Sequence, residues 1–250
     1  MDFITKNGVT WFSFSQNSRL LAGFSTRIGG FSKGEYASMN LGINTNDDKE
    51  IIDRNRNLFF NTVALGFKVN YLNQIHTADI LNVDSPDFRM FCEGDGLFTT
   101  SRNALLSVTI ADCGSVLFHD ENFSFACAIH CGWKGVQQGI ISKAVELISQ
   151  YADLSNVSAY IGPMIRCPHY EVGREFLNYF DPGYFVDKDG KLYFDLNMYI
   201  INKLTRSGIS SIVDCGFDTY FSPEYFFSHR RNNAAGRIVA FIGITDDAIE

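Results

Sequence analysis

Three residues with metal-binding or proton-transferring side chains lie at the ends of strand-like segments of this 250-residue chain. They are His76 in QIHT, Cys113 in ADC and His130 in AIHCGWKG. Thiolate sulfur and neutral imidazole nitrogen suit zinc, and three protein ligands leave a fourth position open for substrate or water. The trio therefore indicates a catalytic zinc site, although a Cys113–His130 nucleophile pair would use the same side chains.

Each of these residues also has an ordinary structural interpretation. Cys113 fits as a small buried apolar residue, His130 as a hydrogen-bonded core histidine, and Asp112 as a turn cap. Neither CxxC nor HxxxH occurs, so any metal site must be assembled from distant segments. Two histidines without comparable context, His119 and His169, are interpreted as structural or surface residues.

Three loops carry cations that could hold an anion. Lys134 lies in GWKG before a predicted helix, where backbone N–H groups and a positive charge favour anions. Arg27 stands just before two glycines, and its guanidinium can bind phosphate through two N–H groups. The arginines of SHRRNNAAGR are better explained locally by a solvated basic loop; they are Arg230, Arg231 and Arg237.

The elements that must position these residues alternate between strand-like and helical patterns. Leu105 to Ile110 is short, branched and uncharged, which is typical of a strand buried on both faces. Other strand-like stretches are 11–24, 71–84, 157–163, 211–216 and 236–244, and helices are predicted at 48–66, 135–151, about 171–180 and 195–208. Some connections are too short for a helix, so the sheets should be mixed. We expect an α+β, layered fold in a single domain spanning residues 1–250.

Composition limits the class of function. The chain is 46% hydrophobic and 20% charged, as ordinary globular proteins are. A net charge of −7 argues against non-specific nucleic-acid binding and against adhesion to anionic membranes. The first 14 residues lack a secretion-signal pattern and no segment approaches 18 uninterrupted apolar residues, so a cytoplasmic location with reduced thiols is expected. No exposed apolar stripe requires a dimer.

Ten short motifs follow one another along nearly the whole chain, from about Gly23 to Ile244. They are STRIGGFS, SMNLG, QIH, GDGLFT, ADC, IHCGWKG, IGPMIRCPHYEVG, FDLN, DCGFDTYFSPEYFFSHRR and GRIVAFI. Their order resembles that of the laccase-domain family, first described as multicopper polyphenol oxidases and now regarded as purine nucleoside phosphorylases. The resemblance implies a layered domain whose fold is similar to that of a cytotoxic necrotizing factor-like cysteine hydrolase.

The resemblance also implies one zinc ion per chain, held by the QxH, ADC and HxGW motifs, here by His76, Cys113 and His130. It implies phosphorolysis of adenosine, inosine, guanosine and methylthioadenosine, together with deamination of adenosine. Purine nucleosides and inorganic phosphate are then the expected partners. The family's STR arginine and LN asparagine are implied to help hold phosphate, which points to Arg27 and Asn40.

Two positions depart from the family pattern. Lys134 replaces the usual arginine and offers a point charge in place of a two-pronged guanidinium, which weakens an anion contact. Cys131 replaces the commoner alanine and adds a thiol that could sensitise the site to oxidation. In the resulting hypothesis, Lys134 helps Arg27 hold phosphate, while Asp112 orients a ligand imidazole or relays a proton.

Three alternatives remain open at this point. Copper oxidase chemistry is disfavoured, because five histidines with no HxH pair cannot furnish several copper sites. A metal-free cysteine hydrolase using Cys113 and His130 is the main rival, and it fits the editing of peptidoglycan precursors linked to some bacterial relatives. A purely structural zinc would need a fourth ligand, and Cys131 is poorly placed because adjacent strand residues point to opposite faces.

Overall fold

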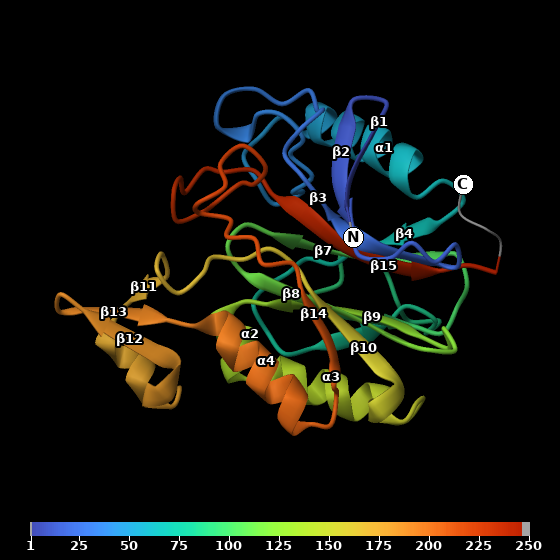
Figure 1. The fold of residues 1–250 in the computed structure, drawn as a ribbon. Coiled ribbons are helices and arrows are strands. Elements are labelled where there is room, and N and C mark those ends of the chain that lie inside the picture. Colours follow the sequence, from blue (N-terminus) through green and yellow to red (C-terminus); the bar gives the residue numbers. More distant parts are fainter. Residues whose placement is uncertain (1, 247–250) are drawn as a thin grey trace.

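Two six-stranded sheets are stacked face to face at the centre of the fold (Figure 1). The computed structural model describes residues 2–246. The first sheet has the order β1 (Asp2–Lys6), β2 (Val9–Ser13), β3 (Leu20–Ser25), β15 (Ile238–Ile244), β7 (Ala104–Ile110) and β4 (Lys68–Asn70). Its β4–β7 pair is parallel and its other pairs are antiparallel.

The second sheet also combines parallel and antiparallel strand pairs. Its order is β14 (Ser211–Asp214), β10 (Val157–Ile161), β8 (Gly114–Asp120), β9 (Ala126–Cys131), β6 (Gly96–Thr99) and β5 (Ile80–Asn82), with parallel pairs at both edges. A small third sheet of β11 (Glu171–Val172), β13 (Lys191–Phe194) and β12 (Phe185–Lys188) projects to one side (Figure 1). The predicted α+β class with mixed sheets is confirmed.

Helices cover the outer face of each sheet (Figure 1). The first sheet is covered by α1 (Lys49–Val63), and the second by α2 (Trp133–Gln137), α3 (Ile140–Ile148) and α4 (Leu196–Arg206). Short 3-10 helices occupy Gly34–Tyr36, Leu154–Asn156, Arg174–Asn178 and Pro182–Tyr184. None of the helices within residues 2–246 combines the length and the apolar character that crossing a membrane requires.

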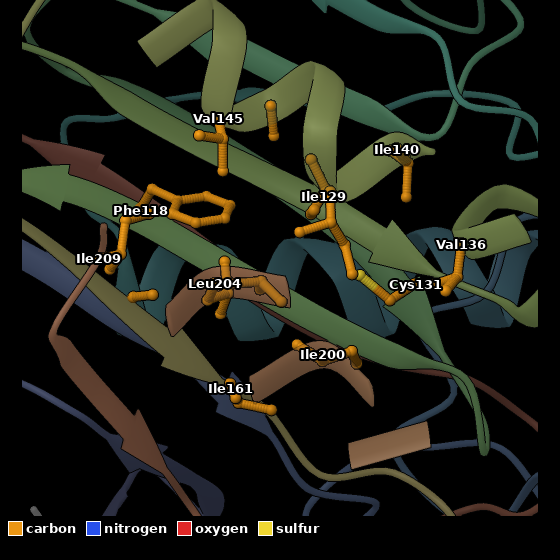
Figure 2. Packing of buried hydrophobic residues seen from close by; sticks show 14 of the residues in the cluster. Phe118, Ile129, Cys131, Val136, Ile140, Val145, Ile161, Ile200, Leu204 and Ile209 are labelled. Carbon is orange, nitrogen blue, oxygen red and sulfur yellow. The ribbon is translucent and has the colours of Figure 1, made fainter. Parts of the chain in front are cut away.

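Three clusters of buried apolar side chains hold these layers together. Figure 2 shows the cluster between the second sheet and its helices, where Phe118 and Ile129 from strands meet Val145 and Leu204 from helices. The space between the sheets is filled mainly by Phe12, Phe24, Leu106, Val108, Leu117, Ala128, Ala240 and Ile242. Each large apolar side chain that is fully buried contributes roughly 1.5–3 kcal/mol. The packed sheets therefore form a rigid support for the loops at their ends.

Two helix predictions are confirmed because the helix ends carry clear signals. Asp48 caps α1 by accepting hydrogen bonds from the backbone N–H groups of Glu50 and Ile51. Asp195 caps α4 in the same way, and Gly208 has a φ of +96°, the left-handed conformation predicted for the stop.

Other predicted elements differ from the structure. The predicted helix at 135–151 is two helices, because Gly139 adopts a φ of +91° between them. The short helix predicted near 171–180 is present only as a 3-10 helix at Arg174–Asn178, which follows the two-residue strand β11. Within 71–84 only β5 (Ile80–Asn82) is a strand, which leaves the segment that carries His76 as a loop.

Candidate active and metal site

Strand pairing brings the predicted ligands together. Cys113 lies in the turn between β7 and β8, and β8 pairs with β9 so that Ser115 is opposite His130. His76 reaches the same place from the loop between β4 and β5. His76 and Asp112, which precedes Cys113, both have left-handed backbones, with φ of 63° and 88°. These turns aim the three side chains at one point.

The three side chains fit one metal ion. His76 Nε2 lies 3.9 Å from Cys113 Sγ, and the centroids of the two imidazole rings are 5.0 Å apart. One ligand atom from each of His76, Cys113 and His130 lies within 4.8 Å of the other two. Gly132 lies against the cluster, because a Cβ there would be 2.7 Å from His76 Cδ2 and 3.4 Å from Cys113 Sγ. Imidazole and thiolate together suit a metal that takes nitrogen and sulfur ligands.

Asp95 holds two of the three candidate ligands. His130 Nδ1 donates a hydrogen bond to Asp95 Oδ1 at 2.7 Å, which leaves His130 Nε2 for the site. Asp95 Oδ2 accepts from the backbone N–H groups of Ile75 at 3.2 Å and Thr77 at 2.7 Å, on either side of His76. The Asp95 side chain has no exposed surface. A single buried carboxylate therefore positions both histidines.

Cys113 and His130 shift each other's proton affinity. Burial opposes the thiolate, but the neighbouring His130 and His76 outweigh it and lower the pKa of Cys113 to about 6. Burial likewise opposes the imidazolium, but Cys113 and Asp95 raise the pKa of His130 to about 9. By contrast, burial raises the pKa of Cys131 far above the ordinary thiol range. Without a metal, the site therefore favours a thiolate–imidazolium pair at Cys113 and His130.

Asp112 was predicted to orient a ligand imidazole, but its hydrogen bonds hold the segment around His229 instead. Its carboxylate accepts hydrogen bonds from Thr219 Oγ1 at 2.6 Å, from Ser228 Oγ at 3.0 Å and from the backbone N–H of Arg230 at 2.6 Å. The carboxylate that contacts the imidazole of a candidate ligand, His130, is Asp95. Asp112 instead binds the hydroxyl of Ser228 and the backbone N–H of Arg230, the residues on either side of His229. A proton relay through Asp112 stays a prediction.

Two cavities meet at the cluster. The first, called here the aromatic cavity, has a volume of about 350 Å³ and is lined by Ile75, His76, Ala111, Asp112, Cys113, Trp133, Lys134, Ile165, Tyr170, His229 and Arg230. The second, called the polar cavity, has a volume of about 320 Å³ and is lined by Gly42, Ile43, Asn44, Leu72, Gln74, His76, Thr109, Ala111, Cys113, His130, His229 and Arg237. They share His76, Ala111, Cys113 and His229. A ligand in either cavity would contact the cluster.

The predicted phosphate-binding residues are distributed unevenly around these cavities. Lys134 is exposed and lines the aromatic cavity. Arg27 lines neither, and its guanidinium donates to the carbonyl oxygens of Ala37 at 2.7 Å and Pro223 at 3.0 Å. Asn40 is fully buried and also lines neither. Its Oδ1 accepts from the backbone N–H groups of two residues of the polar cavity, Gly42 and Arg237.

Sequence reasoning missed several residues that the structure brings to the site. Arg230 and Arg237, interpreted from the sequence as part of a solvated basic loop, line the two cavities, and Arg237 is half-buried. Burial lowers the pKa of Arg237, although the nearby Cys113 and Asp112 favour its charged form. His229 and Asp95 were overlooked as well. The GDG sequence just before a buried strand was the available signal for Asp95.

A family model, named relatives and a solved structure are each similar to nearly the whole chain. Residues 21–245 match the family model described as multi-copper polyphenol oxidoreductase laccase. The chain is 36% identical over 221 residues to a Clostridium acetobutylicum protein named purine nucleoside phosphorylase, covering 85% of this chain and 89% of the relative. It is 31% identical to Escherichia coli purine nucleoside phosphorylase YfiH, covering 87% and 91%. The crystal structure of YlmD from Geobacillus stearothermophilus superposes with a TM-score of 0.86 at 28% identity, covering 98% and 99%.

Proposed function

The chain belongs to the multi-copper polyphenol oxidoreductase laccase family, and from this premise we propose that it is a zinc-dependent purine nucleoside phosphorylase that also deaminates adenosine. The proposed nucleosides are adenosine, inosine, guanosine and methylthioadenosine, with inorganic phosphate as the second substrate. Relatives named purine nucleoside phosphorylase support the reaction. The observation that carries the proposal is the position of His76, Cys113 and His130 where two cavities meet, one lined by Trp133 and Tyr170 and the other by Arg237.

His76, Cys113 and His130 would hold one zinc ion, which when bound supplies a Lewis acid and the means of activating water. The chain's own residues prepare this site. Asp95 keeps the proton of His130 on Nδ1, so that Nε2 presents its lone pair. The same carboxylate fixes the backbone around His76. The ligands are therefore held in place before substrate arrives.

Phosphorolysis requires phosphate to be held against C1′ of the ribose while negative charge builds on the leaving base. Trp133 and Tyr170 give the aromatic cavity flat apolar surfaces that suit a purine ring. The polar cavity offers the guanidinium of Arg237, whose Nη1 donates to the carbonyl oxygens of Ala235 and Gly236 and whose other N–H groups suit phosphate. Separate cavities that meet at the cluster would bring the two substrates to C1′ from different directions.

The remaining cations have supporting roles in this proposal. Lys134 lines the aromatic cavity, where its positive charge would attract anionic phosphate from solution toward the two cavities without binding it directly. Arg27 would keep the loop of residues 25–42 in place through its bond to the Ala37 carbonyl. Asn40 would act through its bond to the backbone of Arg237.

The test is release of nucleobase from inosine and adenosine, with and without phosphate, by protein whose zinc and copper content has been measured. We expect phosphate-dependent release by protein containing about one zinc ion per chain, and loss of release in His76→Ala. Ammonia release from adenosine without phosphate would demonstrate the deaminase. Zinc-loaded protein that releases no base from any of the four nucleosides would refute the phosphorylase.

A metal-free cysteine hydrolase is the second candidate, and a specific observation favours it. Cys113, His130 and Asp95 form the thiol, imidazole and carboxylate series of a cysteine nucleophile, and the pKa of Cys113 is lowered to about 6. Hydrolysis of an amide, such as one in a peptidoglycan precursor, would suit this arrangement. Zinc bound to the thiolate would quench the nucleophile, so amide hydrolysis that increases when metal is removed would support this candidate.

A further inference from the structure

His229 is a histidine that neither the metal cluster nor the hydrogen-bond network uses. It lines both the aromatic and the polar cavity, and its side chain is exposed to them. Its imidazole makes no hydrogen bond or ion pair to any other residue in 2–246. By comparison, the imidazoles of His119 and His169 are bonded to Tyr160 and Asp218. His229 is therefore available to a ligand on either side.

The segment that carries His229 is held by a buried carboxylate, as is the segment that carries His76. Asp112 Oδ2 accepts from Ser228 Oγ and from the N–H of Arg230, the residues on either side of His229. Asp95 Oδ2 holds the residues on either side of His76 in a related way, through the backbone N–H groups of Ile75 and Thr77. Asp112 is also adjacent in sequence to Cys113, so one turn carries a candidate metal ligand and sets the position of His229.

We propose that His229 is a catalytic residue that carries a proton from phosphate in the polar cavity to the leaving purine in the aromatic cavity. The inference rests on the proposed phosphorylase function and deepens it. A neutral imidazole has one nitrogen that accepts a proton and another that donates one. A residue that lines both substrate cavities can therefore serve both substrates in one step.

The step balances as follows. A phosphate oxygen forms a bond to C1′, and the C1′–N9 bond breaks with its electron pair passing into the purine. The phosphate O–H gives its proton to one nitrogen of His229, while the other nitrogen gives its proton to N7 of the base. The products are ribose 1-phosphate and neutral purine, and exchange with water returns His229 to its starting tautomer. Positioned proton transfer of this kind contributes about 10²- to 10⁴-fold to rate.

The experiment compares wild type, His229→Asn and the control His169→Asn on inosine and on 7-methylguanosine. The methylated base carries a positive charge in the nucleoside and leaves neutral without being protonated. With this substrate the phosphate proton has no acceptor to reach and can stay on ribose 1-phosphate until it is lost to water, so neither transfer through His229 is needed. We expect His229→Asn to lower kcat for inosine by about 10²-fold or more, with KM for phosphate nearly unchanged. Its kcat for 7-methylguanosine should stay within about twofold of wild type, and His169→Asn should match wild type on both.

Two other results for His229→Asn would contradict its role in proton transfer. Equal losses on inosine and 7-methylguanosine in His229→Asn would show that the residue holds substrate or structure, and no loss on either would remove it from the reaction. In both cases the active wild type would leave the phosphorylase function standing. A zinc-loaded wild type that is inactive on both substrates would overturn the proposed function, and this inference with it.

Discussion

Asp95 Oδ1 lies 2.7 Å from His130 Nδ1, and the same side chain holds the peptide on both sides of His76 with its other oxygen. A carboxylate behind a ligand histidine fixes the ring and raises its basicity. Here the carboxylate does this for one histidine while it fixes the backbone of another. The geometry of the candidate metal site therefore depends on a residue that binds no metal itself.

Replacing Asp95 with Asn should weaken metal binding by about 10- to 100-fold. The amide is similar in size, but it has no charge to support His130 and only one acceptor oxygen for the four donors that reach Asp95. Zinc affinity can be measured by competition with a chromophoric chelator, with circular dichroism to check the fold. Asp187→Asn is the matched control, because Asp187 pairs with Arg174 in an exposed ion pair. Equal affinities for the two variants would remove Asp95 from the site.

A methyl group at Gly132 should also weaken metal binding, by about tenfold. Gly132 has a φ of −71°, which alanine adopts without strain, so the backbone should tolerate Gly132→Ala. The added Cβ would lie 2.7 Å from His76 Cδ2, so the ring must move. Gly94→Ala is a suitable control, because its Cβ would make only ordinary contacts at 3.4 Å. The measurement is zinc affinity alongside thermal unfolding of both variants, and an unchanged affinity in Gly132→Ala would contradict the geometry.

Cys113 and His130 could be predicted from the sequence because they lie near the ends of buried strands, which can be recognised locally, whereas His76 lies in the loop between β4 and β5. The apolar run before Cys113 is the buried strand β7 that its composition predicts, with a polar turn after it. The capped helices α1 and α4 were predictable for the same reason. The break at Gly139 was not, because apolar residues keep helical spacing on both sides of it and only its φ of +91° separates the helices.

The supporting residues could not be predicted, because their roles depend on tertiary contacts. Asp95 meets His130 only through the pairing of β6 with β9, which joins residues 35 positions apart. Arg237 looks solvated in a basic stretch, yet the fold half-buries it beside the polar cavity. The same folding turns Arg27 toward backbone carbonyls, where the glycines after it suggested an anion.

Alkylation of Cys113 in metal-free protein should follow a pKa of about 6. A lowered pKa means that the reactive thiolate is present above this pH and is lost as the pH falls through it. Iodoacetamide labelling followed by mass spectrometry should therefore reach half its maximal rate near pH 6 at Cys113. Burial raises the pKa values of Cys127 and Cys131, which should stay unlabelled at pH 7.

Two further samples test the cause of that reactivity. His130→Asn removes the main partner of the thiolate, so its labelling midpoint should move up toward the ordinary thiol value of about 8.5. Zinc added to wild type should protect Cys113 from labelling. A wild-type midpoint already near the ordinary value would show that His130 and His76 do not stabilise the thiolate.

Phosphate affinity should depend more on Arg237 than on Lys134. Arg237 lines the polar cavity with a half-buried guanidinium, whereas Lys134 is exposed at the aromatic cavity. Arg237→Lys keeps the charge but loses the planar donors that fit phosphate. A lost charge-assisted hydrogen bond costs about 1.5–3 kcal/mol, so KM for phosphate should rise about 10- to 100-fold while KM for inosine changes little.

Lys134→Gln should raise KM for phosphate only about two- to threefold, through weaker electrostatic attraction. Steady-state kinetics with each substrate varied in turn measures both values, and a larger effect at Lys134 would place phosphate in the aromatic cavity.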